Sequence, residues 1–217
     1  AYHQNKKLDG YNVRKVLKTT SIWFVPMVNP DGVTLVQYGH KAVKYASQAL
    51  KINGGKTNFS AWKANIRGVD LNRQYPTLWK TIVNDPGKPA PQNYKGAKPL
   101  SEPEAQALYN FTKSRKFRAV ISYHSSGELN LSRLDAAPGA RKLGQKISQK
   151  TKYPLINISK RKSGGGFSDW FAVTYKKPAF TLEVAPYAGP GPVPIKQWDR
   201  VWKRNNSVGL ILAHHAP

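Results

Sequence analysis

The chain has 217 residues, of which 40% are hydrophobic and 21% charged, a composition that indicates a single globular domain and excludes wholesale disorder. It contains no cysteine, which excludes disulfides and thiolate metal sites, and no stretch approaches the roughly 18 apolar residues of a membrane span. Its 35 Lys and Arg residues against 11 Asp and Glu residues give a formal net charge of +24. Such a charge indicates either a polyanionic partner or a well-solvated basic surface without one.

The first half of the chain predicts one buried strand followed by a turn, a partly helical stretch and loops. Residues 21–28 are apolar and rich in β-forming side chains, which is typical of a buried strand. The Asn-Pro-Asp-Gly sequence at 29–32 predicts a turn, because Pro fixes φ and Gly accepts positive φ. Residues 34–50 are expected to be partly helical, and 51–61 and 84–100, rich in Gly, Pro, Asn and Lys, are expected to be loops.

The second half predicts alternating helices and strands. Ser101 and Glu104 have the spacing of a capping box, which places the start of a helix that runs to about residue 116. The further helices are expected at 138–152, 167–176 and 194–213, and the strands at 118–123, 155–158 and 179–184. The Ser-Gly-Gly-Gly sequence at 163–166 is expected to be a flexible loop. The alternation predicts one layered α/β domain over residues 1–217.

His124 directly follows a predicted strand, and α/β folds bind ligands beyond the carboxyl ends of their strands. A neutral imidazole in that position is a good zinc ligand. The alternative is a histidine held by structural hydrogen bonds. The remaining histidines lie in less constrained contexts and are assigned to the surface: His3, His40, His214 and His215.

Glu183 lies inside the apolar run 179–185. A lone carboxylate in a buried strand costs several kcal/mol unless it is paired or functional. In zinc hydrolysis a carboxylate near the metal takes a proton from bound water and delivers it to the leaving amine. The alternative is a buried partner for an Arg or Lys.

A third candidate group lies in residues 67–73. Asn72 and Arg73 place an amide beside a guanidinium, a combination that can bind a carboxylate. Arg67 can polarise a carbonyl and stabilise its oxyanion, although any one of so many basic residues is a weak choice. Asp70 can orient a metal ligand or an arginine. The sequence has neither a phosphate-binding Gly-Lys-Ser/Thr loop nor a G-x-S-x-G elbow, which argues against nucleotide hydrolysis and serine-type acyl transfer.

Taken together and in order, six stretches resemble the zinc metallocarboxypeptidase family. They are residues 25–32, 68–73, 101–104, 122–125, 165–170 and 180–184. The resemblance implies a carboxypeptidase A-like fold of the phosphorylase/hydrolase type, with a mixed, mostly parallel sheet and helices on both faces. Within the family, residues 62–68 and 165–171 are most similar to the bacterial γ-D-glutamyl-L-diamino acid endopeptidases, which cut the peptide stem of peptidoglycan.

The same resemblance implies roles for the candidate residues. His124 would bind a single zinc ion, and Glu183 would act as general base and then general acid on zinc-bound water. Arg67 would hold the scissile carbonyl and its oxyanion, and Asn72 with Arg73 would hold a substrate carboxylate. The implied partners are a peptide or peptidoglycan substrate and an anionic cell-wall polymer, and the implied location is extracellular or in the bacterial cell wall.

Two departures from the family matter. The other two zinc ligands of the family lie in a His-x-x-Glu motif, which is absent from this sequence, and the first strands of the family's domain have no counterpart. A catalytic zinc usually takes three protein ligands. The sequence therefore indicates either the C-terminal portion of a longer or cleaved enzyme, completed by an N-terminal segment or a separate chain, or a protein that has lost metal catalysis. The family's mobile Tyr is replaced by Lys160-Arg161-Lys162, which favours an anionic substrate.

The leading hypothesis is a zinc-dependent peptidase that hydrolyses the γ-D-glutamyl–diamino acid bond of peptidoglycan stem peptides. Two alternatives stay open: a metallocarboxypeptidase that removes a C-terminal residue, and a non-catalytic basic protein that binds cell walls. Charge alone would also permit nucleic-acid binding, but the sequence has no recognised nucleic-acid motif, so no specific nucleic-acid partner is expected.

Overall fold

The computed structural model describes residues 6–162 and 164–217. The helices are α1 (Val13–Thr19), α2 (Pro30–Tyr38), α3 (Ala46–Ile52), α4 (Pro103–Lys113), α5 (Ala140–Thr151), α6 (Phe167–Tyr175), α7 (Trp198–Asn205) and α8 (Val208–His215). The strands are β1 (Lys7–Leu8), β2 (Tyr11–Asn12), β3 (Val120–Ser126), β4 (Leu129–Ser132), β5 (Leu155–Asn157) and β6 (Ala179–Ala185). Short 3-10 helices include η2 (Leu71–Arg73) and η5 (Ile195–Gln197).

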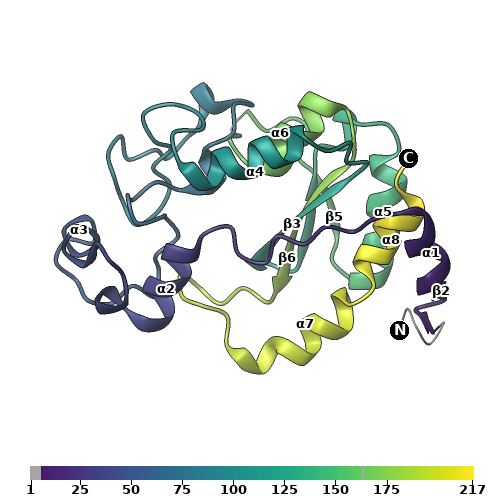
Figure 1. Cartoon of the computed structure of the whole chain (residues 1–217), viewed down its shortest axis with the longest axis horizontal. Helices are drawn as coiled ribbons and strands as arrows, with labels where there is room; N and C mark the ends of the chain where they lie inside the picture. Colours follow the sequence, from purple (N-terminus) through teal and green to yellow (C-terminus); the bar gives the residue numbers. More distant parts are fainter. Residues whose placement is uncertain (1–5, 163) are drawn as a thin grey trace.

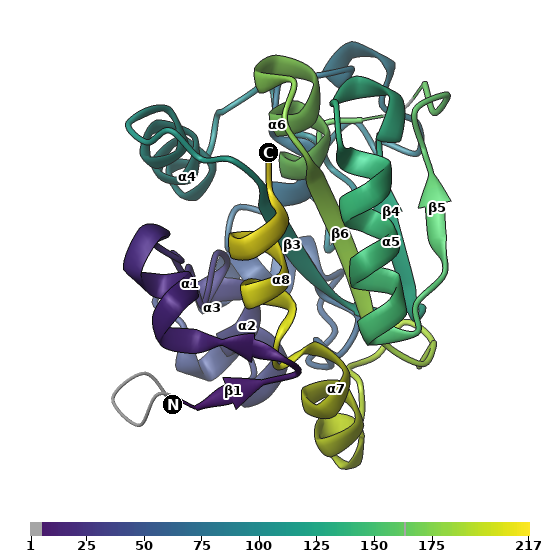
Figure 2. The same ribbon diagram turned by 90° about the vertical axis from the view of Figure 1, so that its right-hand side faces the viewer.

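Four strands form one mixed sheet in the order β3-β6-β4-β5. β3 pairs with β6 and β4 with β5 in parallel, whereas β4 and β6 are antiparallel. Figures 1 and 2 show α5 and α8 on one side of this sheet and α4 and α6 on the other. The expected fold class, a mostly parallel sheet between layers of helices, is confirmed.

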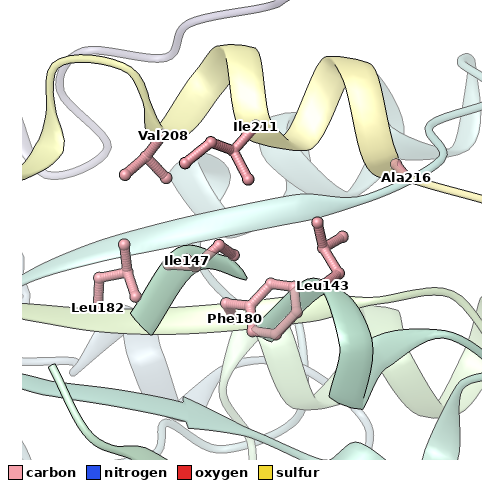
Figure 3. Packing of buried hydrophobic residues seen from close by; sticks show 7 residues of the cluster. All are labelled: Leu143, Ile147, Phe180, Leu182, Val208, Ile211 and Ala216. Atoms are coloured by element: carbon pink, nitrogen blue, oxygen red, sulfur yellow. The ribbon is translucent and has the colours of Figure 1, made fainter. Parts of the chain in front are cut away.

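The core lies on both faces of β6, because alternate side chains of a strand point to opposite faces. On one face Phe180 and Leu182 pack against α5 and α8, as Figure 3 shows. The buried cluster there comprises Leu143, Ile147, Phe180, Leu182, Val208, Ile211 and Ala216. On the other face Ala179 packs with Trp170 and Phe171 of α6. Glu183 is an odd-numbered residue of β6 and so shares the α6 face with Ala179.

The buried strand predicted at residues 21–28 is wrong. This segment forms neither helix nor strand, and most of its apolar side chains are exposed. The exposed ones are Trp23, Phe24, Val25, Met27 and Val28. A strand persists only where a neighbour satisfies its backbone N–H and C=O groups, and within residues 6–162 and 164–217 no strand pairs with this segment. The side chains favour a strand, but the described residues supply no partner strand for it.

Two predictions at the starts of helices are also wrong. The turn expected at 29–32 is the first turn of α2, in which the Asn29 side chain accepts a hydrogen bond from the Gly32 N–H at 3.0 Å. The capping box expected at Ser101 does not form, because α4 begins at Pro103 and the Ser101 hydroxyl donates to Glu102 Oε1 at 2.8 Å. Of the histidines assigned to the surface, His3 lies outside the described residues, His214 is exposed, and His40 and His215 are only partly exposed.

The single helix predicted at 194–213 is wrong, because the structure divides it into η5, α7 and α8 with a turn at residues 206–207. The remaining predicted helices and strands are present, with ends displaced by a few residues. The short strands β1, β2 and β4 and the helix α1 have no counterpart among the predictions, because so few residues carry too little periodicity to be recognised. No helix in the described part of the chain is long and apolar enough to cross a lipid bilayer.

The packing of α5 on the sheet yields a stability prediction. Ile147 is fully buried between β6 and α8, so Ile147→Ala is expected to lower the free energy of unfolding by about 2–5 kcal/mol. The matched control is Ile195→Ala, because Ile195 is 87% exposed. Urea unfolding followed by circular dichroism measures both, and equal effects of the two substitutions would contradict this account of the core.

A second prediction concerns acid stability. Burial, followed by the positive charges of Lys146, His214 and Lys142, lowers the pKa of His215 from its ordinary 6.5, and Tyr11 Oη lies 3.0 Å from its Nε2. The folded pKa lies below the unfolded one, so between them the unfolded state binds more protons and stability rises with pH. The free energy of unfolding is therefore expected to fall as pH drops through about 6.5. His215→Gln should flatten this dependence, and an unchanged slope would refute the assignment.

Candidate functional site

His124 and Glu183 meet at neighbouring positions of two parallel strands. In the β3–β6 ladder His124 lies opposite Glu183, and its Nδ1 lies 3.6 Å from Glu183 Oε1. Both side chains are partly exposed, with 32% and 20% of their surface accessible. Both residues lie toward the carboxyl ends of their strands, where α/β folds bind ligands. The structure thus brings these two candidate residues together, and their roles stay predictions.

The Glu183 carboxylate is held by the backbone. Its Oε2 accepts a hydrogen bond from the Ser126 N–H at 3.1 Å, which leaves Oε1 directed toward His124. Gly127 follows with φ at +144° and so little space that a Cβ there would lie 3.2 Å from the Glu183 Cβ. In the described residues no Arg or Lys forms an ion pair with Glu183. The alternative role for Glu183, as the partner of a buried cation, is thus not found there.

The N-terminus of α6 lies on the same face of the sheet. The Ser168 hydroxyl lies 2.8 Å from the Ser122 hydroxyl on β3 and donates to the Phe180 carbonyl on β6. Ser122 and His124 are two residues apart on one strand, so their side chains share a face. The start of α6 is therefore next to the strand positions that carry the candidate residues.

The Gly-rich segment before α6 is packed and not an open loop. Gly165 donates its N–H to the Thr77 carbonyl at 2.8 Å and accepts from the Tyr75 N–H at 2.9 Å. Gly164 and Gly165 are buried, and a Cβ on Gly165 would lie 2.6 Å from Ile82 Cδ1. The flexible loop expected at 163–166 is therefore wrong for these glycines; Ser163 lies outside the described residues. The close approach requires residues without a side chain.

Asn72 and Arg73 lie in η2 beside this segment. Asp70 caps η2, accepting from the Asn72 N–H at 3.0 Å, while its other oxygen accepts from the Asn93 N–H. Asp70 thus orients backbone, and not the metal ligand or arginine that was expected. The Asn72 Oδ1 lies 3.1 Å from where a Cβ of Gly166 would be. Through Gly166, the N-cap of α6, Asn72 lies at the same end of the fold as the candidate pair.

Arg73 has no acidic partner among the described residues. Its Nη1 donates to the neighbouring Asn72 carbonyl at 3.2 Å, and its Nε is buried without a hydrogen-bond partner. A buried donor without an acceptor lowers the stability of the fold. The guanidinium therefore has N–H groups left that could donate to an anion supplied from outside the chain.

Arg67 is held differently. Its backbone N–H and that of Val69 donate to the Asn65 side-chain oxygen, which fixes the turn. Its side chain is 61% exposed, and its Nη1 lies 3.9 Å from Glu102 Oε2. Within the described ranges no hydrogen bond or ion pair joins Arg67, Asn72 or Arg73 to the His124–Glu183 pair. Their convergence on one substrate therefore stays a prediction.

The residues present do not by themselves fit a catalytic zinc. In the part of the chain that the structure describes, no three His, Asp or Glu side chains are grouped so that they could hold a metal ion. Glu128, the acidic residue nearest to His124 in the sequence, instead pairs with Arg200 and Arg204, each at 2.7 Å. His124 would be one ligand of a site that needs about three from protein.

The positions that sequence reasoning missed are the backbone N–H of Ser126 and the glycine beside it. Both lie against Glu183. Gly127 follows directly after the last residue of β3, and a glycine at such a position often marks a close approach of the backbone to another group. The sequence could have indicated the contact in this way.

Comparison with known proteins identifies the class. Residues 8–206 match the sequence profile of peptidase M14, the zinc carboxypeptidases. The chain therefore belongs to the zinc carboxypeptidase family, as the six motifs implied. Its relatives include gamma-D-glutamyl-L-diamino acid endopeptidase 1 of Lysinibacillus sphaericus, 35% identical over 94% of this chain and 51% of the relative. Human mast cell carboxypeptidase A is 36% identical over 59% of this chain and 29% of its own length.

Solved structures agree on the fold. Carboxypeptidase A from Helicoverpa armigera superposes with a TM-score of 0.61 at 18% identity, covering 88% of this chain and 51% of that one. Murein-tripeptide amidase from Escherichia coli O157 superposes with a TM-score of 0.52 at 25% identity, covering 86% and 65%. The fold is carboxypeptidase A-like. The chain spans about half the length of the curated relatives that it matches over most of its own length.

The contact between Gly166 and Asn72 can be tested directly. Gly166 has an ordinary φ of −80°, so alanine fits its backbone, but the added Cβ would press on Asn72 Oδ1. Gly166→Ala is expected to shift the NMR signals of the Asn72 side-chain amide with little loss of stability. Gly191→Ala is the matched control, because a Cβ there meets open space. An unmoved Asn72 signal in Gly166→Ala would contradict the arrangement.

Proposed function

We propose that this chain supplies the substrate-binding and proton-transfer side of a peptidase that cuts peptidoglycan stem peptides at the γ-D-glutamyl–diamino acid bond. The observation that carries the proposal is the pairing of His124 with Glu183 across parallel strands, in a chain of the zinc carboxypeptidase family. The named activity of the Lysinibacillus relative, which matches 94% of this chain, supports the choice of bond. A bacterial cell-wall or extracellular location follows from that substrate.

Each candidate side chain has a task in this proposal. Glu183 takes a proton from the attacking water and passes it to the leaving amine, with the Ser126 N–H keeping its carboxylate in place. Arg67, with its exposed side chain, stabilises the oxyanion of the scissile carbonyl. Asn72 and Arg73 bind a carboxylate of the stem peptide, and the unpartnered Arg73 Nε supports this role.

The zinc expected in this family would polarise the scissile carbonyl and the water. Because the described residues offer His124 alone, we propose that a segment outside this sequence, in the same chain or a separate one, supplies the remaining ligands. Two features support this. The apolar side chains of residues 23–28 are largely exposed, and β3 is the last strand on its side of the sheet, with no further strand among the described residues paired to its outer edge.

A test of the chemistry uses Glu183→Gln, which keeps the shape but cannot accept a proton. With zinc and the segment that supplies the remaining ligands both present, cleavage of a γ-D-glutamyl-meso-diaminopimelate muropeptide should fall about 10²–10⁴-fold. Asp135→Asn is the control, because Asp135 is 58% exposed and pairs with Arg141 on the surface. Cleavage that survives a chelator, or that Glu183→Gln leaves unchanged, refutes the mechanism.

Substrate binding is measured separately, because it does not need the complete metal site. Arg73→Met should weaken binding of a muropeptide with a free carboxylate, measured by calorimetry, with Arg141→Met as the exposed control. If amidation of the peptide's C-terminal carboxylate abolishes cleavage, the carboxypeptidase alternative gains. Binding without cleavage, even with zinc and the ligand-supplying segment both present, favours the non-catalytic alternative, which the net charge of +24 and the lack of a three-ligand cluster in the described residues support.

A further inference from the structure

The turn between β3 and β4 crosses the carboxyl end of β6. β3 and β4 lie on either side of β6, so the two residues that join them, Gly127 and Glu128, pass over its last residues. Three consecutive backbone N–H groups donate to groups at that end. The Ser126 N–H donates to Glu183 Oε2 at 3.1 Å. The next two N–H groups donate to the Ala185 carbonyl, at 2.7 and 3.1 Å. The position of this turn therefore determines where the carboxylate of the candidate base is held.

Glu128 has an unfavourable backbone conformation in this turn. Its φ is +52°, in the left-handed region that side chains other than those of Gly, Asn and Asp rarely adopt. The neighbouring Gly127, with φ at +144°, adopts its conformation without such a penalty. A strained residue of this kind persists only where surrounding contacts hold it, and such residues gather at functional sites. The contacts of the Glu128 side chain therefore matter for the turn.

Those contacts come from helix α7. The Glu128 Oε1 lies 2.7 Å from Arg200 Nη2 and 2.7 Å from Arg204 Nη1, and Arg200 Nη2 also donates to Oε2 at 2.9 Å. The side chains of Glu128 and Arg204 are only 25% and 26% exposed. A carboxylate bound by two guanidinium groups and partly shielded from water interacts more strongly with them than an exposed ion pair does.

α7 also contacts the strand that carries Glu183. The Asn205 side-chain amide donates to the Tyr153 hydroxyl at 2.9 Å, and that hydroxyl donates to the Val184 carbonyl at 2.6 Å. The Arg204 guanidinium lies over the Tyr153 ring, 5.6 Å from its centroid. The helix is thus connected to Glu183 by two routes: through the turn to its carboxylate, and through Tyr153 to the next residue of β6.

We infer that Glu128 is a positioning residue for Glu183. Its pairing with Arg200 and Arg204 keeps residue 128 in the left-handed conformation. That conformation in turn keeps the Ser126 N–H on Glu183 Oε2, which leaves Oε1 for the proton transfer. Glu128 acts through the turn and takes no part in the chemistry itself. The inference rests on the proposed function, in which Glu183 is the base. The alternative is that Glu128 only anchors α7.

The experiment follows the Ser126 N–H by NMR in the chain itself, without zinc and without turnover. Glu128→Gln removes the negative charge and keeps the length of the side chain. Glu128→Asn removes the same charge, but asparagine adopts the left-handed region readily. Arg200→Met weakens the pair from the helix side. The control is Asp199→Asn, which removes an exposed carboxylate of the same helix.

Hydrogen exchange of the Ser126 N–H is expected to be about tenfold or more faster in Glu128→Gln, because a hydrogen bond to a charged group contributes about that factor. The proton signal of this N–H should also move upfield. Glu128→Asn should have a clearly smaller effect, Arg200→Met an effect in the same direction, and Asp199→Asn none. Because the Gln and Asn variants lose the same charge at the same position, the difference between them reports the backbone conformation.

The inference is overturned if Glu128→Gln leaves the Ser126 N–H unchanged, whether or not the signals of α7 move. It is also overturned if the Gln and Asn variants have equal effects, since the pair would then not act by holding the left-handed conformation. Arg200→Met leaves Arg204 in place and decides the question if Glu128→Gln does not fold. An unchanged Ser126 N–H in that variant overturns the inference as well.

Failure of this inference is distinguishable from failure of the proposed function. The proposed function fails if cleavage survives Glu183→Gln, whereas this inference is read on the Ser126 N–H, so either can fail alone. With zinc and the ligand-supplying segment both present, Glu128→Gln should lower kcat and leave KM nearly unchanged, because it displaces the base and not the groups that bind substrate. A rise in KM with kcat unchanged would overturn the positioning role.

Discussion

The parallel pairing of β3 with β6 places His124 opposite Glu183, and the rest of the candidate site is arranged around this register. A shift by one residue would move one of these side chains to the opposite face of the sheet. The register is fixed by the core, because Phe180 and Leu182 must face α5 and α8 while the alternate residues face α6. Apolar packing on one face thus positions the polar pair on the other.

Close backbone approach is the second constraint on the site. Gly127 admits the Glu183 side chain, and Gly165 and Gly166 admit η2 and Asn72. At these positions a larger residue would displace a candidate functional group. The glycines therefore contribute by leaving room for neighbouring groups, and they carry no reactive side chain themselves. They also connect elements that are far apart in the sequence, so that η2, α6 and β6 share one end of the fold.

The few carboxylates of the chain differ in what they do: some hold the structure together, and Glu183 is left for the candidate site. Of the 11 carboxylates, several hold structure: Asp70 caps η2, and Glu128 anchors α7. Glu183, by contrast, has no Arg or Lys partner among the described residues. Scarce acidic residues in a chain of net charge +24 leave a basic surface that suits an anionic polymer.

Periodicity and motif order in the sequence determined the α/β class, most helices and strands, and the zinc carboxypeptidase family, because these depend on local patterns and on residue order. They also singled out His124 and Glu183, since a polar side chain at the end of an apolar run is visible without a structure. Only the tertiary structure decided that residues 21–28 pair with no strand within 6–162 and 164–217, and that Asp70 orients backbone. It also decided that the glycines at 164–166 are packed. These features depend on which segments lie next to one another, and no local pattern encodes a neighbour that is distant in the chain.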